Sequence, residues 1–232
     1  MIFFDIDETL LNNSAAERAA AAQFYDLHKD VLQEPVEAFI DRWQTQTEHN
    51  IQRYLAGELS FQGQRRARLR QVFASKRSLS DAEADATFET YLHFYENSWI
   101  LFPDVEDCLN ELNGHQLGII SNGNAAQQKQ KLHSLGIIDR FTTIVISGEV
   151  GITKPAPQMF QLACQKAGMP PSGCWHIGDN FNVDVQGSIS AGMNAIWLNR
   201  NGQKPCSDIP TIESLSELGD KLYADRNEEG YK

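Results

Sequence analysis

The stretch "MIFFDIDETLLNN", residues 1–13, decides the fold of this chain. Residues 2–6 place β-branched and aromatic side chains on both faces, as in a fully buried strand of a parallel sheet. Two aspartates separated by one residue, Asp5 and Asp7, mark the end of that strand, and Thr9 follows closely. A carboxylate at the end of a buried strand is costly unless an opposite charge offsets it. The stretch therefore predicts that other parts of the chain bring a cation to this strand.

The size and charge of the chain limit what it can do. Its 232 residues suffice for one sizeable domain with an insertion or for two small domains. The formal net charge of -11 argues against nucleic acid polymers and anionic membranes as general partners, because both carry the same sign. A small or locally recognised substrate fits this charge better.

Neither a targeting segment nor a disulfide framework is visible in the sequence. The N-terminus has no basic region, and Asp5 interrupts its apolar run, so it does not resemble a secretory signal. No uninterrupted apolar stretch is long enough to span a bilayer. We therefore expect a cytoplasmic protein. The cysteines have no C-x-x-C pair and are expected to be buried, reduced thiols: Cys108, Cys164, Cys174 and Cys206.

The segment 14–98 is predicted to be all helical. Strong helix formers follow residue 14, which predicts a first helix over about 15–30. The other helix signals are two capping boxes and two apolar stripes between them: Ser14 with Glu17, Ser80 with Glu83, and the stripes at 36–43 and 69–73. Trp43, on the first stripe, could serve either a core or a partner, and the sequence leaves the oligomeric state open.

After Pro103 the pattern changes to short apolar runs that alternate with amphipathic helices, which is typical of βαβ units and a parallel sheet. The runs are "QLGIIS" (116–121), "TTIVIS" (142–147), "CWHIG" (174–178) and "NAIWL" (194–198), with helices expected at 124–135, 156–168 and 183–191. The prediction is an α/β fold, a Rossmann-like, doubly wound parallel sheet formed by 1–13 and 99–232, with 14–98 inserted as a helical domain. The tail 225–232 has a composition typical of disorder.

Polar side chains follow four of the predicted strands. In a parallel sheet the carboxyl ends of the strands meet at one edge, where ligands bind. The residues expected there are Asp5, Asp7 and Thr9 after the first strand, Ser121 and Asn122 after the second, Lys154 after the third, and Asp179 and Asp184 after the fourth. Each has an ordinary structural explanation by itself, for example Ser121 as a helix cap, Lys154 as a solvated lysine and Asp184 beside a helix dipole. The sequence indicates a functional site because all of these residues are expected at the same edge of the sheet.

The chemistry of this set predicts a magnesium-dependent reaction on a phosphate ester. Crowded carboxylates repel one another unless a cation lies among them. Mg²⁺ binds few carboxylates and completes its octahedron with water and substrate phosphate oxygen. An aspartate can attack phosphorus to give an aspartyl phosphate, and Asp7 could protonate the leaving oxygen and later deprotonate the attacking water.

These motifs resemble the haloacid dehalogenase superfamily, in the subgroup whose helical cap is inserted after the first motif. The resemblance covers nearly the whole chain and is carried by "FFDIDETLL" (3–11), "IISN" (119–122), "GITKPAPQMF" (151–160) and "WHIGDNFNVDVQGSISAGM" (175–193), with "FPDVEDCLNEL" (102–112) and "WLNRNG" (197–202) in support.

The resemblance implies a role for each motif residue. Asp5 would be the nucleophile and Asp7 the general acid and base. Magnesium would be held by Asp5, the Asp7 backbone carbonyl and Asp179. The remaining expected roles are phosphoryl binding by Ser121 and Lys154, orientation of the substrate by Asn122, and outer support from Asp184 and Thr9.

The reaction type follows from Asp7. Dehalogenases of this superfamily typically lack an aspartate there, so the chain resembles a phosphatase, with a sugar phosphomutase or a non-catalytic binding module on the same fold as alternatives. Many relatives have glycine in place of Glu8, and some nucleotidases have glutamate, which favours a nucleoside monophosphate weakly, with phosphoglycolate as another candidate.

A basic run in the predicted cap, residues 64–77, holds six of the twenty lysines and arginines. It either draws an anionic substrate to the sheet or forms a solvated helix face paired with acids, and the second interpretation is favoured. Arg65 and Arg66 lie near the apolar stripe of their helix, so either could turn toward the catalytic edge.

Overall fold

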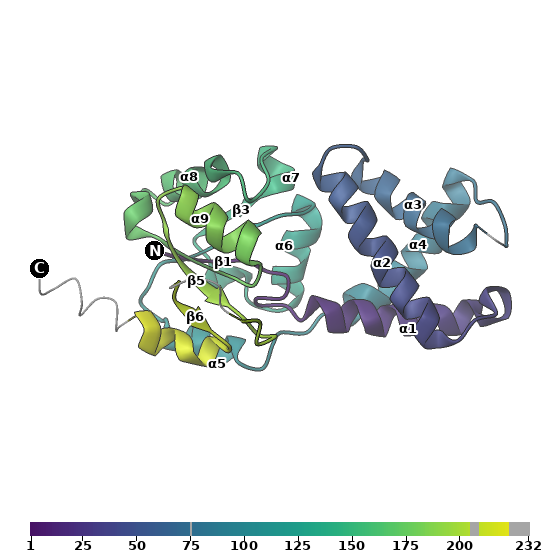
Figure 1. Ribbon diagram of the computed structural model, residues 1–232, viewed down its shortest axis with the longest axis horizontal. Helices are drawn as coiled ribbons and strands as arrows, with labels where there is room; N and C mark the ends of the chain where they lie inside the picture. The colour runs from purple at the N-terminus through teal and green to yellow at the C-terminus, as the bar shows by residue number, and fades with distance from the viewer. Residues whose placement is uncertain (75, 205–208, 223–232) are drawn as a thin grey trace, which may run out of the picture. The chain divides into compact units, whose positions relative to one another are not determined.

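The computed structural model describes residues 1–74, 76–204 and 209–222 and divides the chain into two compact units (Figure 1). The first, called the sheet unit, comprises Met1–Asn12 and Leu101–Lys232. The second, called the helical unit, comprises Asn13–Ile100. Both Cys206 and the tail 225–232, for which the sequence makes predictions, lie outside the described residues.

In the described part of the sheet unit, the strands form one parallel six-stranded sheet in the order β3-β2-β1-β4-β5-β6. Its strands are β1 (Ile2–Phe4), β2 (Leu117–Ser121), β3 (Thr143–Ile146), β4 (Trp175–Gly178), β5 (Asn194–Leu198) and β6 (Thr211–Ile212). The predicted Rossmann-like α/β fold is confirmed. The sequence did not indicate β6, because two residues are too few to show a strand pattern.

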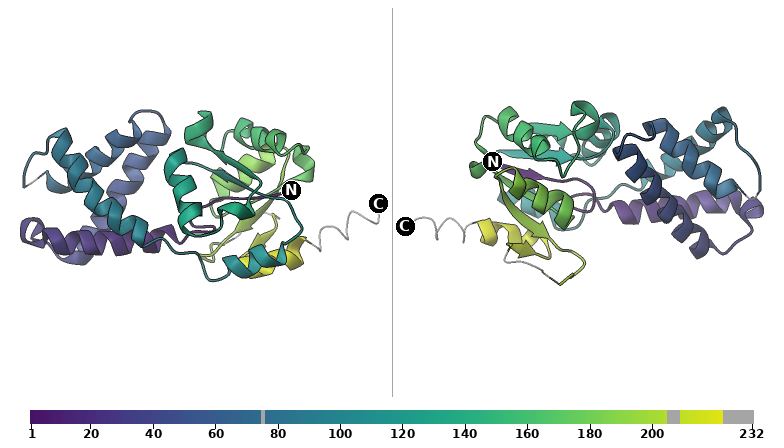
Figure 2. Two further views of the ribbon diagram at one scale, coloured as in Figure 1. Left: turned by 180° about the vertical axis from the view of Figure 1, so that it is seen from behind. Right: turned by 45° about the horizontal axis from the view of Figure 1, so that its top comes forward.

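Helices cover both sides of this sheet. They are α5 (Val105–Glu111), α6 (Ala125–Ser134), α7 (Ser147–Val150), α8 (Pro157–Lys166) and α9 (Gln186–Ser190), with a π-helical turn, Phe181–Val185, before α9. On one side α8 buries Phe160 and Met159 in a core cluster that includes Phe3 of β1. Figures 1 and 2 show α8 and α9 near each other and α5 on the opposite side of the strands. The sheet is therefore buried on both faces, as its apolar strands require.

Because β1 lies between β2 and β4, it determines what lies beside the motif aspartates. Phe4 aligns with Ile119 of β2 and with Ile177 of β4, and the Asp5 amide donates to the Ile177 carbonyl at 3.0 Å. The paired part of β1 ends at Phe4, so Asp5 is the first residue after it. Side chains that follow β2 and β4 must then lie on either side of it.

The helical unit contains α1 (Asn13–Leu32), α2 (Val36–Leu55), α3 (Phe61–Phe73) and α4 (Asp81–Asn97). Its core is aromatic, with Trp43 fully buried and its ring centroid 4.4 Å from that of Tyr91. Trp43 therefore serves the core of this unit. The capping box of Ser80 and Glu83 is present at the start of α4, as predicted.

The start of α1 differs from the prediction. This helix begins at Asn13, so Ser14 lies in its first turn and not ahead of it as the cap residue. The Asn13 side-chain amide donates to the Glu17 carboxylate at 3.2 Å within this first turn. Residues that cap helices also occur within a first turn, so helix boundaries shift by one or two positions.

The basic run forms contacts within the helical unit itself. Arg66 donates to Asp85 and to Asp81 at 2.5 Å each, and Arg70 also pairs with Asp81. Arg68 is buried, with its guanidinium carbon 4.9 Å from the centre of the Trp43 ring. Arg66 and Arg70 therefore lie on a helix face paired with acids, as the favoured interpretation expects, whereas Arg68 packs against an aromatic ring of the core.

Two further expectations concern the chain as a whole. The three described cysteines, Cys108, Cys164 and Cys174, are buried and free, in agreement with the prediction of reduced thiols. Within the described residues, the helices are all too short or too polar to cross a bilayer.

Candidate active site

Asp5 lies at the carboxyl edge of the sheet and is 7% exposed. Its Oδ1 accepts a hydrogen bond from Nζ of Lys154 at 2.7 Å. The pKa of Asp5 is raised to about 6, because burial and the nearby carboxylate of Asp184 raise it more than the charge of Lys154 lowers it. The lysine therefore supplies the opposite charge that the first strand predicts.

Lys154 also binds a second carboxylate. Its Nζ donates to Oδ1 of Asp184 at 2.6 Å, and this oxygen lies 3.3 Å from Nε2 of His176. Burial alone would raise the pKa of Asp184, but Lys154 and the His176 hydrogen bond hold it well below its ordinary range. Lys154 is only 4% exposed, so it is not the solvated loop lysine that its position beside a proline could suggest.

Gly178 allows the Asp184 carboxylate to lie against β4. A Cβ at residue 178 would come 2.4 Å from Cγ of Asp184, a distance that real structures do not tolerate. The other carboxylate oxygen of Asp184 accepts a hydrogen bond from the Asn180 amide at 3.0 Å. The glycine and the turn after β4 together fix this carboxylate in the site.

Asp179 completes a group of three carboxylates. One oxygen each from Asp5, Asp179 and Asp184 lies within 4.8 Å of the others. The pKa of Asp179 is raised to about 8, mainly by burial and then by the charges of Asp5 and Asp184. Crowded oxygen ligands with insufficient positive charge are the donor set that suits a hard divalent cation, so these residues fit a magnesium site.

Asp7 has two partners on α6. Its Oδ1 accepts a hydrogen bond from Nζ of Lys131 at 2.6 Å, and its Oδ2 accepts one from Nε2 of Gln128 at 2.9 Å. The sequence did not single out either partner. Their positions relative to Leu132 could have indicated them. Gln128 lies four residues and Lys131 one residue before this leucine, and the same face of α6 buries all three.

The residues at the end of β2 connect these groups. Oγ of Ser121 accepts a hydrogen bond from Gln128 at 2.9 Å. The Asn122 side chain forms two hydrogen bonds with the backbone of Lys154, donating to its carbonyl at 3.0 Å and accepting from its amide at 2.8 Å. Asn124, and not Ser121, caps α6. Asn122 therefore holds the loop that carries the lysine.

Thr9 and Glu8 form the turn that follows the motif aspartates. Thr9 is fully buried, and among the residues that the structure describes none bonds its Oγ1. Its carbonyl accepts a hydrogen bond from Arg200 at 3.0 Å. Glu8 has a φ of 60°, and its amide donates to the Leu11 carbonyl at 2.9 Å. The turn therefore places Glu8 in the left-handed region, which glycine adopts without strain.

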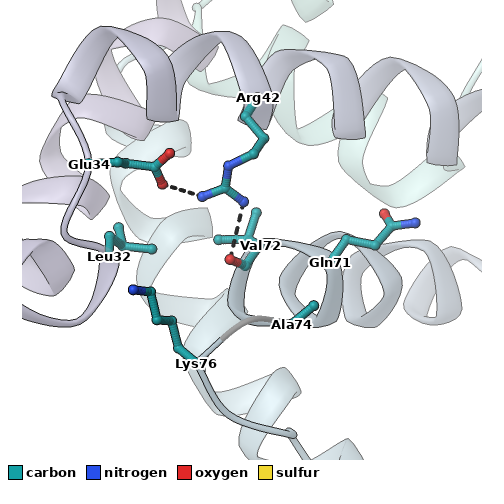
Figure 3. A pocket seen from close by; sticks show the side chains of 7 residues that line it. All are labelled: Leu32, Glu34, Arg42, Gln71, Val72, Ala74 and Lys76. Atoms are coloured by element: carbon teal, nitrogen blue, oxygen red, sulfur yellow. Dashed lines mark hydrogen bonds and ion pairs between the residues drawn. The ribbon is translucent and has the colours of Figure 1, made fainter.

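A hollow of about 350 Å³ lies in the helical unit, between the ends of α1 and α3 (Figure 3). Arg42 extends into it, pairs with Glu34 and donates to the Val72 carbonyl at 3.1 Å. The Lys76 ammonium contacts the Gln33 side chain at 3.3 Å. The charged groups that line this hollow, Arg42, Glu34 and Lys76, have partners within the helical unit.

The fold and this constellation agree with a family match. Residues 1–192 match the family model of haloacid dehalogenase-like hydrolases, and the chain belongs to this family. The protein is therefore an enzyme of the phosphatase-type hydrolase class, with homologues that are named phosphatases.

The chain is similar to several curated relatives. It is 26% identical over 225 residues to the N-acylneuraminate-9-phosphatase of Mus musculus, covering 94% of this chain and 91% of the relative. It is 28% identical over 235 residues to the glyceraldehyde 3-phosphate phosphatase of Methanothermobacter thermautotrophicus, covering 95% and 98%. A third relative, the pyrimidine 5'-nucleotidase of Escherichia coli, is 37% identical over about half of each chain, 121 residues.

Solved structures show the same fold. A HAD hydrolase of Bacillus subtilis bound to magnesium superposes with a TM-score of 0.77 at 22% identity, covering 95% of this chain and 97% of that one. A 2-haloacid dehalogenase of Pseudomonas syringae superposes with a TM-score of 0.71 at 28% identity, covering 96% and 97%. The fold is thus shared by enzymes with different reactions, and the site residues must decide between them.

Proposed function

We propose that this enzyme is a Mg²⁺-dependent phosphomonoester hydrolase that acts on a small phosphorylated metabolite through an aspartyl phosphate on Asp5. One observation carries the proposal. Oxygens of Asp5, Asp179 and Asp184 lie within 4.8 Å of one another, and Asp5 accepts a hydrogen bond from Lys154 at 2.7 Å. Asp7 lies two residues away and accepts hydrogen bonds from donors of its own. This arrangement offers a nucleophile, an acid and base, and a cation site within one edge of the sheet.

In the proposed first step an Asp5 oxygen attacks phosphorus, and the bond from phosphorus to the leaving oxygen breaks. Asp7 gives its proton to that oxygen, so the alcohol leaves neutral. In the second step water attacks phosphorus while Asp7 accepts its proton, and the bond between phosphorus and Asp5 breaks. Inorganic phosphate is released and both aspartates return to their starting states.

The residues that would hold magnesium are Asp5, Asp179 and the Asp7 backbone carbonyl, with Asp184 as support. The three carboxylates within 4.8 Å fit this ion, and the pKa of Asp179 is raised to about 8 by burial first and by the charges of Asp5 and Asp184 second. When bound, Mg²⁺ would neutralise charge on the phosphoryl group and draw it toward the nucleophile.

Ser121 and Lys154 would contact the phosphoryl oxygens. The Ser121 hydroxyl follows β2 and the Lys154 ammonium contacts Asp5, so both belong to the edge where phosphorus must arrive. Donors that are held in place before the reaction stabilise charge as it builds in the transition state. Asn122 supports this role through its two hydrogen bonds to the Lys154 backbone.

Asp7 also distinguishes hydrolysis of phosphate esters from dehalogenation. A halide needs no proton as it leaves, whereas an alkoxide does, and Asp7 is the group available to give one. The inactive binding module is disfavoured because Asp5, Asp7 and Lys154 are all present. A sugar phosphomutase would use the same residues and is separated from a hydrolase by its product.

We propose that the helical unit acts as a cap that selects the substrate and excludes water during the first step. The relatives are named for a sugar acid 9-phosphate, a triose phosphate and pyrimidine nucleotides, so the substrate class extends across small phosphorylated metabolites. Nucleoside monophosphates and phosphoglycolate remain the candidates that the sequence favours. A cytoplasmic location likewise remains a prediction from the sequence.

The test is a panel of phosphomonoesters assayed for phosphate release with and without Mg²⁺. The panel includes nucleoside monophosphates, phosphoglycolate, triose phosphates and sugar phosphates. We expect release of phosphate from at least one ester, dependent on the metal, and loss of turnover in Asp5→Asn. Full turnover in Asp5→Asn, or no hydrolysis of any ester, would refute the proposal. Rapid isomerisation of a sugar phosphate with its bisphosphate would identify a mutase instead.

A further inference from the structure

We propose that Lys131 and Gln128 of α6 are positioning residues for the general acid and base, Asp7. The inference rests on the proposed phosphatase function and extends it to two residues outside the motifs. Lys131 is 3% exposed and Gln128 is 2% exposed, so both polar side chains are removed from water. Both reach across the sheet unit to a residue more than 120 positions away in the chain.

Lys131 holds one oxygen of Asp7. Its Nζ lies 2.6 Å from Oδ1, within the range of a strong, charge-assisted hydrogen bond. The Lys131 side chain is 4% exposed and that of Asp7 is 32% exposed, so only the lysine charge is fully removed from water. The cost of that removal and the remaining contact of Asp7 with water offset most of the attraction in the pair. The contribution of this pair to the fold is therefore small, while its effect on the direction of the Asp7 carboxylate is large.

Gln128 holds the other oxygen and connects it to the phosphate side of the site. Its Nε2 donates to Oδ2 of Asp7 and to Oγ of Ser121, at 2.9 Å each. One amide group thus fixes the distance between the acid and a phosphoryl-binding hydroxyl.

The loop after β2 places a glycine beside the Gln128 side chain. Gly123 has a φ of 136°, and a Cβ there would lie 3.3 Å from the Gln128 side chain. The backbone therefore makes room for this amide.

The two donors together remove the rotational freedom of the Asp7 side chain. With Lys131 on one oxygen and Gln128 on the other, the plane of the carboxylate is fixed by α6. Proton transfer to a leaving oxygen depends on this alignment, since a small misplacement of an acid reduces its contribution strongly. A second consequence is that α6, and not only the motif loop, determines how efficiently Asp7 works.

The dependence of the rate on the leaving group separates this role from a purely structural one. An alkyl phosphate needs a proton on its leaving oxygen, whereas p-nitrophenolate leaves readily without one. The experiment measures kcat/KM, which covers the steps through formation of the aspartyl phosphate, for p-nitrophenyl phosphate and for an alkyl phosphate. The enzymes are the full-length, Mg²⁺-loaded wild type and its Lys131 and Gln128 variants.

In Lys131→Met we expect kcat/KM to fall about 10-fold to 100-fold with the alkyl phosphate and less than about 3-fold with p-nitrophenyl phosphate. Lys131→Arg, which keeps a donor and a charge, should restore most of the alkyl activity. Gln128→Leu should also lose more kcat/KM with the alkyl phosphate than with p-nitrophenyl phosphate, but by a smaller factor. If Lys131→Met folds poorly, the Gln128→Leu variant tests the proposal instead. Asp7→Asn should show the contrast in full.

The matched control is Lys129→Met on the same helix. Lys129 pairs with Glu149 at 2.8 Å, and both side chains are 44% exposed, so its removal should leave both rates unchanged. Equal losses with both substrates in Lys131→Met and Gln128→Leu, or no loss with either, would overturn the positioning role. An inactive wild type would instead refute the proposed phosphatase function, so the two failures are distinguishable.

Discussion

Lys154 contacts Asp5 with its ammonium nitrogen 2.7 Å from the carboxylate oxygen, and the same nitrogen lies 2.6 Å from Asp184. One buried cation therefore serves two buried carboxylates. Burial alone would lower the pKa of Lys154, but the charges of Asp184 and Asp5 raise it above its ordinary value. The lysine is thus charged when it meets the substrate.

Replacing Lys154 by Met should affect stability and activity together. Without the ammonium group two buried carboxylates lose their partner, so we expect the free energy of unfolding to fall by about 3–5 kcal/mol in the metal-free protein. Phosphatase turnover should fall at least about 100-fold, because the phosphoryl oxygens lose a fixed donor. Urea unfolding and phosphate release measure the two effects. Lys166→Met, at the end of α8, is the control, and a Lys154→Met protein with normal turnover would contradict the assignment.

Magnesium should stabilise the folded protein through Asp179. At a concentration of about 100 times its Kd, a ligand that binds only the folded state adds about 2.7 kcal/mol to the free energy of unfolding. We expect Mg²⁺ to raise the melting temperature of the wild type, and chelation with EDTA to reverse the shift. In Asp179→Asn the shift should disappear, while the metal-free variant melts above the metal-free wild type because one crowded carboxylate is gone.

The control for the metal experiment is Asp107→Asn, which removes an exposed carboxylate on α5. Its Mg²⁺ shift should equal that of the wild type. If Asp179→Asn kept the full shift, the metal would lie elsewhere. If it melted below the wild type without metal, repulsion among the three carboxylates would not be the dominant interaction.

Asp104 should make stability depend on pH. Burial alone would raise the pKa of this carboxyl, but hydrogen bonds from Arg200 (2.8 and 3.0 Å), Ser214 (2.7 Å) and the Leu215 amide (2.8 Å) lower it below its ordinary value. A group whose pKa is lower in the folded state stabilises the fold above its unfolded pKa of about 3.9, and this contribution is lost as the pH falls through the folded value.

We therefore expect Asp104→Asn to lower the free energy of unfolding by about 1–3 kcal/mol near neutral pH, and by progressively less below about pH 4. Urea unfolding of both proteins across this pH range measures the difference. The exposed Asp107→Asn variant serves again as the control. A difference that stays constant down to about pH 3 would contradict the role of the Asp104 charge.

Glu8 should carry backbone strain that glycine relieves. Its φ of 60° brings Cβ close to the following carbonyl, which costs roughly 1–2 kcal/mol for a residue with a side chain. Two variants separate this strain from the charge, because Glu8→Ala and Glu8→Gly both remove the carboxylate but only glycine removes Cβ. We expect Glu8→Gly to exceed Glu8→Ala in free energy of unfolding by about 1 kcal/mol in urea titrations. Equal stability of the two variants would mean that the turn is unstrained.

The expected site residues could be placed from the sequence because parallel strands impose a simple rule. Each run of apolar residues ends at the same edge, so Asp5, Ser121 and Asp179 had to be near neighbours once the strands were recognised. The same rule does not reach residues within a helix. Gln128 and Lys131 appear in the sequence as ordinary polar positions of an amphipathic segment.

Local pattern and tertiary structure therefore decided different features of this protein. The order of strands and helices and the family motifs follow from short-range spacing, which reflects which faces must be buried. The packing of the helical unit decided that Trp43 belongs to its core, a choice that the sequence left open. The bond from Lys131 to Asp7, the two hydrogen bonds of Asn122 to Lys154 and the left-handed turn at Glu8 depend on how helices and loops dock on the finished sheet. Side-chain contacts across more than a hundred residues result from packing, and no local spacing encodes them.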